Sequence, residues 1–354
     1  WYFFVTYNMK EKVYTFDLSL SWKVLRAISK IDRFDASWSS IEKIEGKSLK
    51  QLKSVATIES VGASTRIEGS KLTNEDVEEL LSKIDINKIE DRDSQEVVGY
   101  FNVLDLISES FSDIGIQESN IKNQHNLLLK FSGKDVWHRG DYKQHTNAVQ
   151  ATFPDGTKQV IFKTTDPGFP TEIAMRSLIE WYTDEKEVHP LISCAAFIYD
   201  FLSIHPFQDG NGRLSRLLTT LLLLQSGYKW IEYVSFEHEI EHNKNTYYRV
   251  LRSCQAQRPN EDITEWIDFF LESLSNLQDK LQNKLEISGW EGNLTPKEKE
   301  VLTFIGNNAG SKSGEISNKL NITKPTVKRL LVSLIEKGLI RKYGKGAGTN
   351  YSVK

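Results

Sequence analysis

The strongest constraint on the fold is a pair of apolar segments separated by a short polar stretch. Residues 191–202 are almost entirely apolar, and residues 213–224 are rich in leucine. The first segment predicts a buried helix that ends just before His205, because Pro206 disfavours helical backbone angles in the residue before it. The second segment predicts another buried helix. A polar loop must therefore lie at the N-terminus of a buried helix.

This loop reads His205-Pro-Phe-Gln-Asp-Gly-Asn-Gly-Arg-Leu-Ser-Arg216. Gly210 and Gly212 allow backbone angles that other residues avoid, and they let a phosphate approach the backbone closely. The free N–H groups and the dipole at a helix N-terminus attract anions. Arg213 and Arg216 are three residues apart, so both project from one side of the first turn, where guanidinium groups pair well with phosphates. The stretch predicts a polyphosphate site.

Three further side chains of the loop suit reactions of phosphates. His205 can act as a general base near neutral pH. Asp209 offers the hard oxygen ligands that Mg²⁺ prefers when it is held against phosphates, and Asn211 can donate to a phosphate oxygen. A lone histidine in a loop more often only satisfies backbone groups. Here glycines, asparagine and arginines converge at one helix start, which favours phosphoryl or nucleotidyl transfer.

The stretch matches the Fic family motif H-x-F-x-(D/E)-G-N-G-R-x-x-R at every specified position, so the chain resembles Fic proteins. Most Fic proteins transfer AMP from ATP to a hydroxyl group of a target protein. The resemblance implies that His205 deprotonates a Ser, Thr or Tyr hydroxyl and that Phe207 anchors the loop. Asp209 would hold Mg²⁺ between the α- and β-phosphates. Gly210, Asn211 and Gly212 would form an anion hole. Arg213 would contact the β-phosphate region, and Arg216 would hold the γ-phosphate.

A second element, Ser64-Thr-Arg-Ile-Glu68-Gly69, lies about 140 residues upstream. Residues 54–67 predict a helix with Gly69 as its C-cap, and Ser64 and Glu68 share one face. Alone, such a glutamate would be a solvated residue before a helix end. Beside the loop, the segment resembles the family's N-terminal, class II-like inhibitory motif (S/T)-x-x-x-E-(G/N). The resemblance implies that Glu68 pairs with Arg216, displaces the γ-phosphate and leaves ATP misaligned. In some relatives this glutamate also orients a water that removes AMP.

Two weaker resemblances concern the walls of the site. Residues 150–163 contain a Pro-Asp-Gly turn between short β-prone runs and predict a hairpin. The family carries a hairpin flap here that holds the target by strand addition, although an ordinary surface hairpin has the same pattern. Many relatives have arginine where this chain has Lys143. Further on, residues 243–248 resemble the segment beside the adenine pocket, so Tyr247 or Tyr248 packs against adenine or, alternatively, only in the core.

The C-terminal segment has a different pattern. Thr295-Pro-Lys-Glu predicts a capped helix start, residues 313–320 a second helix, and Thr323 the cap of a third. Two strands around a Gly-rich turn follow, which is the order of a winged helix-turn-helix domain. Residues 295–354 hold twelve Lys and Arg against four Asp and Glu, a net of +8, whereas the whole chain carries −3. A basic module suggests DNA binding, through Lys324, Thr326, Lys328 and Arg329.

Protein contacts or dimerisation are the alternative for this winged helix. One copy offers few phosphate contacts, so a homodimer is the better hypothesis for DNA binding. The interpretation divides the chain into an N-terminal helical region (1–120, with the inhibitory helix at about 54–69), a catalytic core (121–287), a linker (288–294) and the winged helix (295–354). The expected fold is mainly α-helical, with a β-hairpin flap.

Composition agrees with an intracellular, cytoplasmic enzyme. An apolar content of 39% supports sizeable cores, and the two cysteines, Cys194 and Cys254, form no disulfide framework or zinc spacing. The apolar start at residues 1–5 lacks the features of a signal peptide, and residues 217–224 are too short to span a membrane. We therefore expect no membrane partner.

Together these patterns predict a protein adenylyltransferase that uses ATP and Mg²⁺, modifies an unidentified target protein as well as itself, and is inhibited by Glu68. Two alternatives remain. One is a different reaction at the same site, namely AMP removal or phosphocholine, uridylyl or phosphate transfer. The other is a DNA-binding regulator whose Fic core only senses nucleotide.

Overall fold

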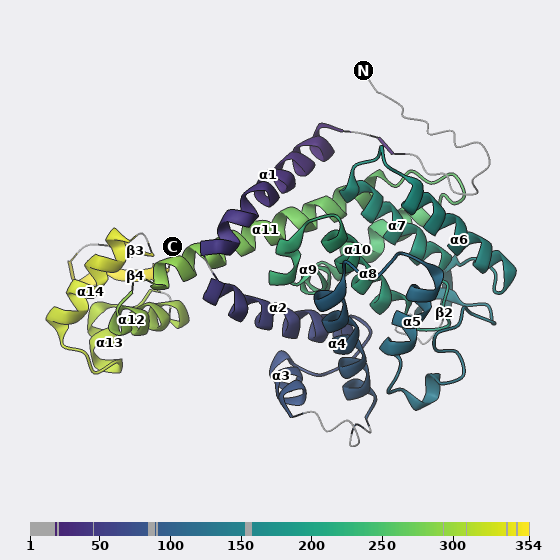
Figure 1. Cartoon of the computed structure of the whole chain (residues 1–354). Helices are drawn as coiled ribbons and strands as arrows, with labels where there is room; N and C mark the ends of the chain where they lie inside the picture. The colour runs from purple at the N-terminus through teal and green to yellow at the C-terminus, as the bar shows by residue number, and fades with distance from the viewer. Residues whose placement is uncertain are drawn as a thin grey trace. The chain divides into compact units, whose positions relative to one another are not determined.

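The computed structural model describes residues 18–353, apart from residues 20, 45, 84–88, 90, 153–157, 293, 309, 338 and 345. It is mainly helical, as predicted (Figure 1). The chain divides into two compact units, Trp1–Asp279 and Lys280–Lys354. In the described part of the chain, no helix is long and apolar enough to cross a membrane.

The first unit consists of helices with one small sheet between them in the chain. Its elements are α1 (Trp22–Ile44), α2 (Gly46–Ile67), α3 (Asn74–Ser82), α4 (Arg92–Ser110), α5 (Glu118–Leu128), η2 (Gly133–Asp135), β1 (Ala148–Thr152), β2 (Lys158–Lys163), α6 (Phe169–Asp184), α7 (Pro190–Ile204), α8 (Asn211–Gln225), η3 (Lys229–Tyr233), α9 (Phe236–His242) and α10 (Lys244–Gln255). Helix α11 (Thr264–Gly292) begins in this unit and ends in the second.

Helices α7 and α8 form the centre of this unit, which confirms the two buried helices expected from the apolar segments. Every residue of α7 after Pro190 is buried, and α8 is buried from Arg213 to Leu224. The chain leaves α7 at His205, whose φ of +53° is left-handed, and enters α8 after Gly210, whose φ is +80°. Pro206 and Gly210 thus break what would otherwise be one continuous apolar helix.

Helix α2 carries the Ser64–Gly69 segment into the same centre. It is longer than the expected 54–67, and it packs against α4, α8 and α9. The chain then turns at Gly69, whose φ is +109°, and the Ser70 N–H donates to the Thr65 carbonyl at 3.1 Å. This geometry confirms Gly69 as the residue that ends the helix.

Strands β1 and β2 pair antiparallel and confirm the hairpin. Their register shifts between Val149 and Gln150, which marks an irregularity in the ladder. The predicted Pro-Asp-Gly turn lies outside the described residues.

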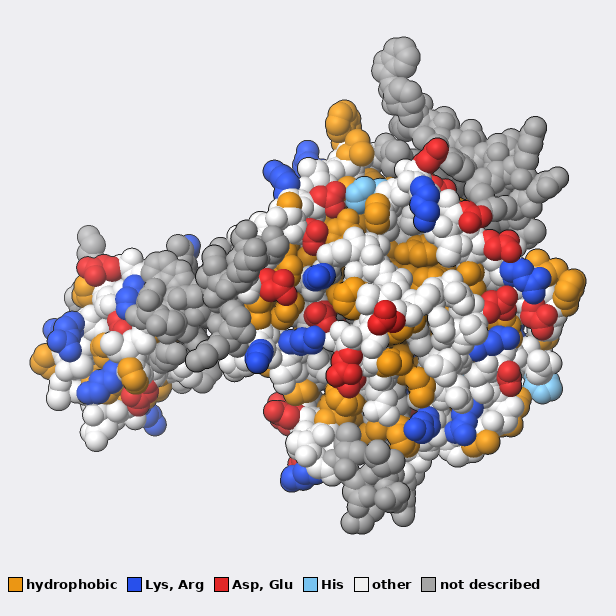
Figure 2. Space-filling model, viewed as in Figure 1, with side chains coloured by type: hydrophobic (Ala, Val, Ile, Leu, Met, Phe, Trp, Pro, Cys, Tyr) orange, Lys and Arg blue, Asp and Glu red, His pale blue; other side chains and the backbone are white. Residues whose placement is uncertain are grey.

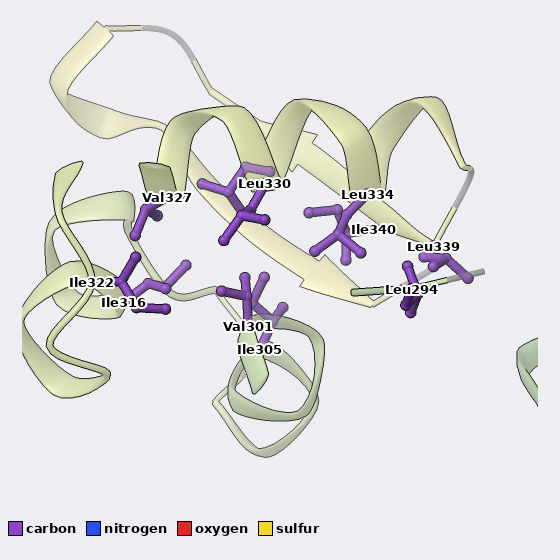
Figure 3. Close-up of a cluster of buried hydrophobic side chains, with 11 residues drawn as sticks. Leu294, Val301, Ile305, Ile316, Ile322, Val327, Leu330, Leu334, Leu339 and Ile340 are labelled. Carbon is purple, nitrogen blue, oxygen red and sulfur yellow. The ribbon is translucent and has the colours of Figure 1, made fainter. Parts of the chain in front are cut away.

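The second unit contains a three-helix core and a β-hairpin, as expected for a winged helix. Its elements are α12 (Pro296–Asn307), α13 (Ser313–Lys319), α14 (Lys324–Glu336), β3 (Ile340–Tyr343), η4 (Gly346–Gly348) and β4 (Asn350–Val353). Figure 3 shows aliphatic side chains from all three helices and β3 meeting in one cluster, among them Val301, Ile316, Leu334 and Ile340. The Thr295–Glu298 capping box forms as predicted.

Two details of this unit differ from expectation. Thr323 occupies the cap position of α14, but its side chain accepts no backbone hydrogen bond; its hydroxyl instead meets that of Thr326 at 2.9 Å. Helix α11 continues to Gly292 and so includes most of the segment expected as a linker, residues 288–294. Residues 288–292 contain no proline, so the helix can continue through them, and its end instead falls shortly before Pro296.

Candidate active site

The loop between α7 and α8 lines a cavity of about 250 Å³. The cavity wall brings together residues that the sequence analysis assigned to one site but that lie up to 180 residues apart. They are His205, Asp209, Gly210, Asn211, Gly212, Arg213 and Arg216 from the loop and α8, Glu68 after α2, and Tyr247 and Tyr248 from α10. Ser64 and Gly69 do not line it.

Phe207 anchors the loop in the core. Its side chain is fully buried, and its ring stacks on His125 with a centroid distance of 3.8 Å. The Asn211 side chain then closes the loop on itself, because its Oδ1 accepts from the Phe207 N–H at 2.9 Å and its Nδ2 donates to the Phe207 carbonyl at 2.7 Å. These bonds use Oδ1 and one of the two Nδ2 protons, so the expectation that Asn211 donates to a phosphate oxygen stays a prediction. In this structure the side chain shapes the loop.

Arg213 is a buried cation that can donate further hydrogen bonds. Its side chain is 2% exposed, and its Nε and Nη1 have no hydrogen-bond acceptor among the described residues. Two carboxylates lie nearby, Glu96 at 3.4 Å and Asp209 at 3.6 Å. Buried N–H groups without acceptors are costly unless a ligand completes them. An anion in the cavity would supply the missing acceptors.

Arg216 is paired with the segment after α2, as the resemblance implied. Its Nη2 donates to Glu68 Oε1 at 2.9 Å and to the Ser64 carbonyl at 3.0 Å. Its Nε donates to Ser64 Oγ at 2.9 Å. Ser64 is completely buried, so one serine satisfies the guanidinium through both its side chain and its backbone.

The ion pair between Glu68 and Arg216 is strong enough to overcome burial. Burial alone would raise the pKa of Glu68, but the charge and hydrogen bond of Arg216 lower it below the ordinary value. A carboxyl whose pKa is lowered stays ionised above its ordinary range and loses the pair only as pH falls through the lowered value. The contact is therefore fully formed at neutral pH.

Gly212 makes room for this carboxylate. A Cβ atom at residue 212 would lie 2.5 Å from Glu68 Oε1, which is closer than any real contact. The backbone at Gly212 is not left-handed, so the glycine is needed for space rather than for its conformational freedom. The same space beside the N-terminus of α8 would admit a phosphate oxygen if Glu68 moved away.

His205 lies half-buried at the cavity wall, and its imidazole is neutral at physiological pH. Desolvation lowers its pKa to about 4, and the nearby Lys143 cation contributes in the same direction. A neutral imidazole can accept a proton, which is the state that a general base requires. Its Nδ1 lies 3.4 Å from the Leu202 carbonyl, so the Nε2 atom is the better candidate to meet a substrate.

Asp209 keeps an accessible carboxylate at the same wall. Its side chain is 43% exposed, and its Oδ1 accepts from the Gly210 N–H at 2.7 Å. Burial would raise its pKa, but Arg213 and the Gly210 N–H lower it below the ordinary value. The group is thus an ionised oxygen ligand open to a cation. No group of three or more potential ligand residues exists in the described chain.

Tyr247 and Tyr248 both line the cavity, although Tyr247 is also almost fully buried in the core. Their rings meet edge to face at 5.1 Å, and Tyr247 also packs against Trp266. Tyr247 is therefore a core residue that also forms part of the cavity wall, while its contact with adenine stays a prediction.

Sequence reasoning missed three residues that support the site. Glu96 on α4 approaches Arg213, Tyr100 on the same helix is buried beside Arg216, and His125 on α5 holds the loop. Their signal in the sequence is a polar residue on the buried face of an apolar helix, which by itself is ambiguous. Lys143, noted only as a departure from the family's arginine, proves to contact the loop.

Comparison with known proteins agrees with this geometry. Residues 115–223 match the model of the Fic/DOC family, and residues 293–346 match that of the MarR family. The chain contains a Fic domain followed by a MarR-type winged-helix domain. The Fic match covers the loop and α8 except its last two residues, ends before Tyr247 and begins after the Glu68 segment.

Curated proteins are similar to this chain over longer stretches than the family models cover. Protein adenylyltransferase Fic of Drosophila yakuba is 24% identical over 299 residues, which cover 83% of this chain and 54% of that protein. The Drosophila mojavensis counterpart is 27% identical over 209 residues, covering 57% and 38%. The chain thus spans about half the length, or less, of these relatives.

Solved structures share the fold. A Fic family protein from Desulfovibrio desulfuricans aligns over 98% of both chains with a TM-score of 0.63 and 22% identity. Fic-1 from C. elegans aligns over 75% of this chain and 72% of its own, with a TM-score of 0.55 and 18% identity. At these identities the likeness establishes the architecture and not the reaction.

Proposed function

We propose that the protein is an adenylyltransferase that moves AMP from ATP to a hydroxyl group of a protein. The observation that carries this proposal is the meeting of a neutral histidine, an ionised aspartate and two buried arginines in one cavity at the N-terminus of α8. The curated relatives named as adenylyltransferases support the same activity.

The residues present suit ATP with Mg²⁺. Arg213 Nε and Nη1, which lack a hydrogen-bond acceptor among the described residues, and the N-terminus of α8 would donate to phosphate oxygens. Asp209 would hold Mg²⁺, which commonly takes one or two protein carboxylates and completes its coordination with substrate phosphates and water. A single accessible carboxylate beside two arginines is such an arrangement.

The reaction would be an in-line displacement at the α-phosphorus. The hydroxyl oxygen of the target forms the new P–O bond, the bond to the bridging oxygen breaks, and pyrophosphate leaves. His205 would take the hydroxyl proton. Catalysis would otherwise consist of positioning and charge neutralisation, as in phosphoryl transfer generally.

Glu68 would inhibit this reaction by occupying Arg216. The carboxylate already satisfies the guanidinium N–H group that a γ-phosphate would need, and it lies in the space beside Gly212. ATP could then bind only with its terminal phosphate displaced. In the alternative reaction the same glutamate would orient a water that removes AMP, and the assays test that outcome as well.

A comparison of donors tests the proposed activity. The Glu68→Gly variant is incubated with Mg²⁺ and, in separate reactions, ATP, UTP and CDP-choline, and the mass of the intact protein is measured. We expect a mass increase of one AMP group per modified site with ATP. A phosphocholine or UMP increase would instead identify another transfer on the same site, and no increase with any donor would contradict transfer altogether.

The anchoring of α2 allows the inhibitory contact to be weakened without touching the cavity. Arg66 pairs bidentately with Glu241 at 2.7 and 3.0 Å, and Lys244 Nζ donates to the Ile67 carbonyl at 2.7 Å. Glu241→Gln removes the charge of the anchor and should raise self-labelling roughly two- to tenfold, as the partial loss of a half-buried ion pair would.

The control for this variant is Glu79→Gln, which removes an exposed ion pair with Lys83 on α3. It should leave labelling at the wild-type level. Labelling that rises equally in both variants would show that the anchor has no specific role.

DNA binding by the winged helix is a second proposal, supported by the charges of α14. Lys324, Lys328 and Arg329 are all exposed at its N-terminal half, as are Arg341 and Lys342 on β3. Figure 2 shows such basic side chains on the surface of this unit, together with acidic ones. In helix-turn-helix domains, basic side chains near the start of the recognition helix, here α14, can meet the major groove and its phosphates.

This proposal predicts a steep salt dependence. Duplex DNA binding by the full chain, measured by fluorescence anisotropy, should weaken as salt rises, and Lys328→Ala should reduce the slope of log Kd against log salt by about 1. Lys280→Ala, outside the winged helix, is the control. Salt-insensitive binding, or no binding at low salt, would favour a protein partner for this domain.

A further inference from the structure

Four backbone carbonyls in and beside the loop before α8 meet donor groups from α5 and from the segment that follows it. Lys143 Nζ donates to the Ile204 carbonyl at 3.0 Å, and the Lys143 N–H donates to the Pro206 carbonyl at 2.8 Å. Asn147 Nδ2 donates to the Phe207 carbonyl at 2.9 Å. His125 Nε2 lies 3.0 Å from the Asp209 carbonyl. The donors come from α5 and from the segment that connects it to β1.

This arrangement determines which backbone groups face the cavity. Carbonyl oxygens carry partial negative charge and would repel a phosphate, whereas the free N–H groups at the start of α8 attract it. We infer that His125 and Lys143 are positioning residues that hold the two ends of this loop, His125 for its phosphate-binding end and Lys143 for its His205 end. The inference deepens the proposed function and partly rests on it.

The hydrogen bonds of His125 establish its tautomer. Its Nδ1 accepts from the Gly140 N–H at 2.9 Å, so the ring proton must reside on Nε2, from which it is donated to the Asp209 carbonyl. The ring is fully buried and stacks on Phe207. It also lies close to Gly210, where an added Cβ would approach Nε2 to 3.3 Å. His125 therefore contacts the turn through both hydrogen bonding and packing.

Lys143 holds the residues on either side of His205. Its ammonium group is fully buried and has three acceptors for its three protons, namely Asn147 Oδ1 at 2.9 Å, Thr164 Oγ1 at 2.9 Å and the Ile204 carbonyl. The left-handed backbone of His205 is unfavourable for a residue with a side chain. Hydrogen bonds to the carbonyls before and after His205 offset this cost and fix the direction of the imidazole.

We expect substitutions at the two ends of the loop to have different kinetic effects. Both are measured in protein that also carries Glu68→Gly. His125→Phe keeps an aromatic ring against Phe207 but loses both hydrogen bonds. We expect it to raise the Mg²⁺ concentration for half-maximal rate and the KM for ATP about 10- to 100-fold, as the loss of outer-shell support does at metal sites. Lys143→Met should lower kcat by a similar factor while the KM for ATP changes less than about twofold.

Control variants distinguish a positioning role of His125 and Lys143 from a general effect on the stability of the protein. Lys143→Arg keeps a cation with donors and should recover part of kcat. His138→Phe removes a neighbouring buried histidine that bonds Asp135 instead of the loop, and Lys122→Met removes a cation that lies over the Tyr142 ring. Both controls should retain the parent kinetics. If His125→Phe and Lys143→Met change kcat and KM in the same way, the assignment of separate ends is wrong.

Two readouts do not depend on transfer activity. The ¹⁵N NMR signals of His125, assigned by their loss in His125→Phe or His125→Gln, should show a proton on Nε2, and a proton on Nδ1 would overturn the inference. Calorimetry with ADP and Mg²⁺ should show weaker binding to His125→Phe and unchanged binding to Lys143→Met. If the Glu68→Gly parent transfers nothing, the proposed function fails, while these two measurements still decide the role of His125.

Discussion

Glu68→Gly should increase self-labelling by α-labelled ATP and Mg²⁺ roughly ten- to hundredfold over the wild-type protein. The change removes the carboxylate that accepts from Arg216 Nη2 at 2.9 Å. A hydrogen bond to a charged group contributes about 1.5–3 kcal/mol, and each 1.4 kcal/mol corresponds to a factor of ten. The released guanidinium can then bind the terminal phosphate in the space beside Gly212.

The comparison needs two further variants. Glu68→Gln keeps the size of the side chain but not its charge, so it should give intermediate labelling. Glu78→Gln, on the exposed side of α3, removes one negative charge outside the ion pair and should change nothing. Equal, low labelling in the wild type and in Glu68→Gly would show that Glu68 does not restrain the site.

His205→Ala in the Glu68→Gly background should abolish transfer while nucleotide binding survives. General-base help contributes about 10²–10⁴-fold, so the residual rate should fall by about that factor. ATP binding should persist because the phosphate contacts come from Arg213, Arg216 and the N-terminus of α8. Labelling and calorimetry with Mg²⁺ and ADP measure the two properties separately.

His242→Ala is the matched control, since His242 is exposed on α9 and its Nδ1 contacts only the His238 carbonyl. Its labelling should equal that of the parent. Unchanged labelling in His205→Ala would remove the histidine from the reaction and would falsify the general-base assignment. Loss of both labelling and nucleotide binding would instead place His205 in binding.

Local patterns in the sequence predicted the two central helices, the helix before Gly69, the hairpin and the elements of the winged helix. Pro206 and Gly210 mark the break between α7 and α8 because they act on the backbone directly, and the structure places that break where expected. The Thr295–Glu298 capping box forms for the same reason. The hydrogen bond of the Thr323 side chain was harder to predict, because such a side chain has several possible partners. The end of α11 was also harder to predict, because residues 288–292 contain no proline that would stop the helix.

The site was predictable only in part. His205, Asp209 and the arginines belong to one short motif, so their proximity follows from the chain itself. The contact of Arg216 with Glu68 spans 148 residues and came from a resemblance, and the structure forms it. The two bonds of Asn211 to the Phe207 backbone were not expected from the sequence, because they depend on how the loop folds back on itself.

The sequence alone determined the two central helices, the loop between them and the basic charge of the C-terminal module, since these depend on neighbouring residues and on composition. Only the tertiary structure decided that Arg216 is held by Ser64 and Glu68, that Arg213 retains unpartnered N–H groups, and that His125 and Lys143 hold the loop carbonyls. The physical reason is that these contacts join helices distant in the chain, and packing selects them from many possible pairs of polar residues.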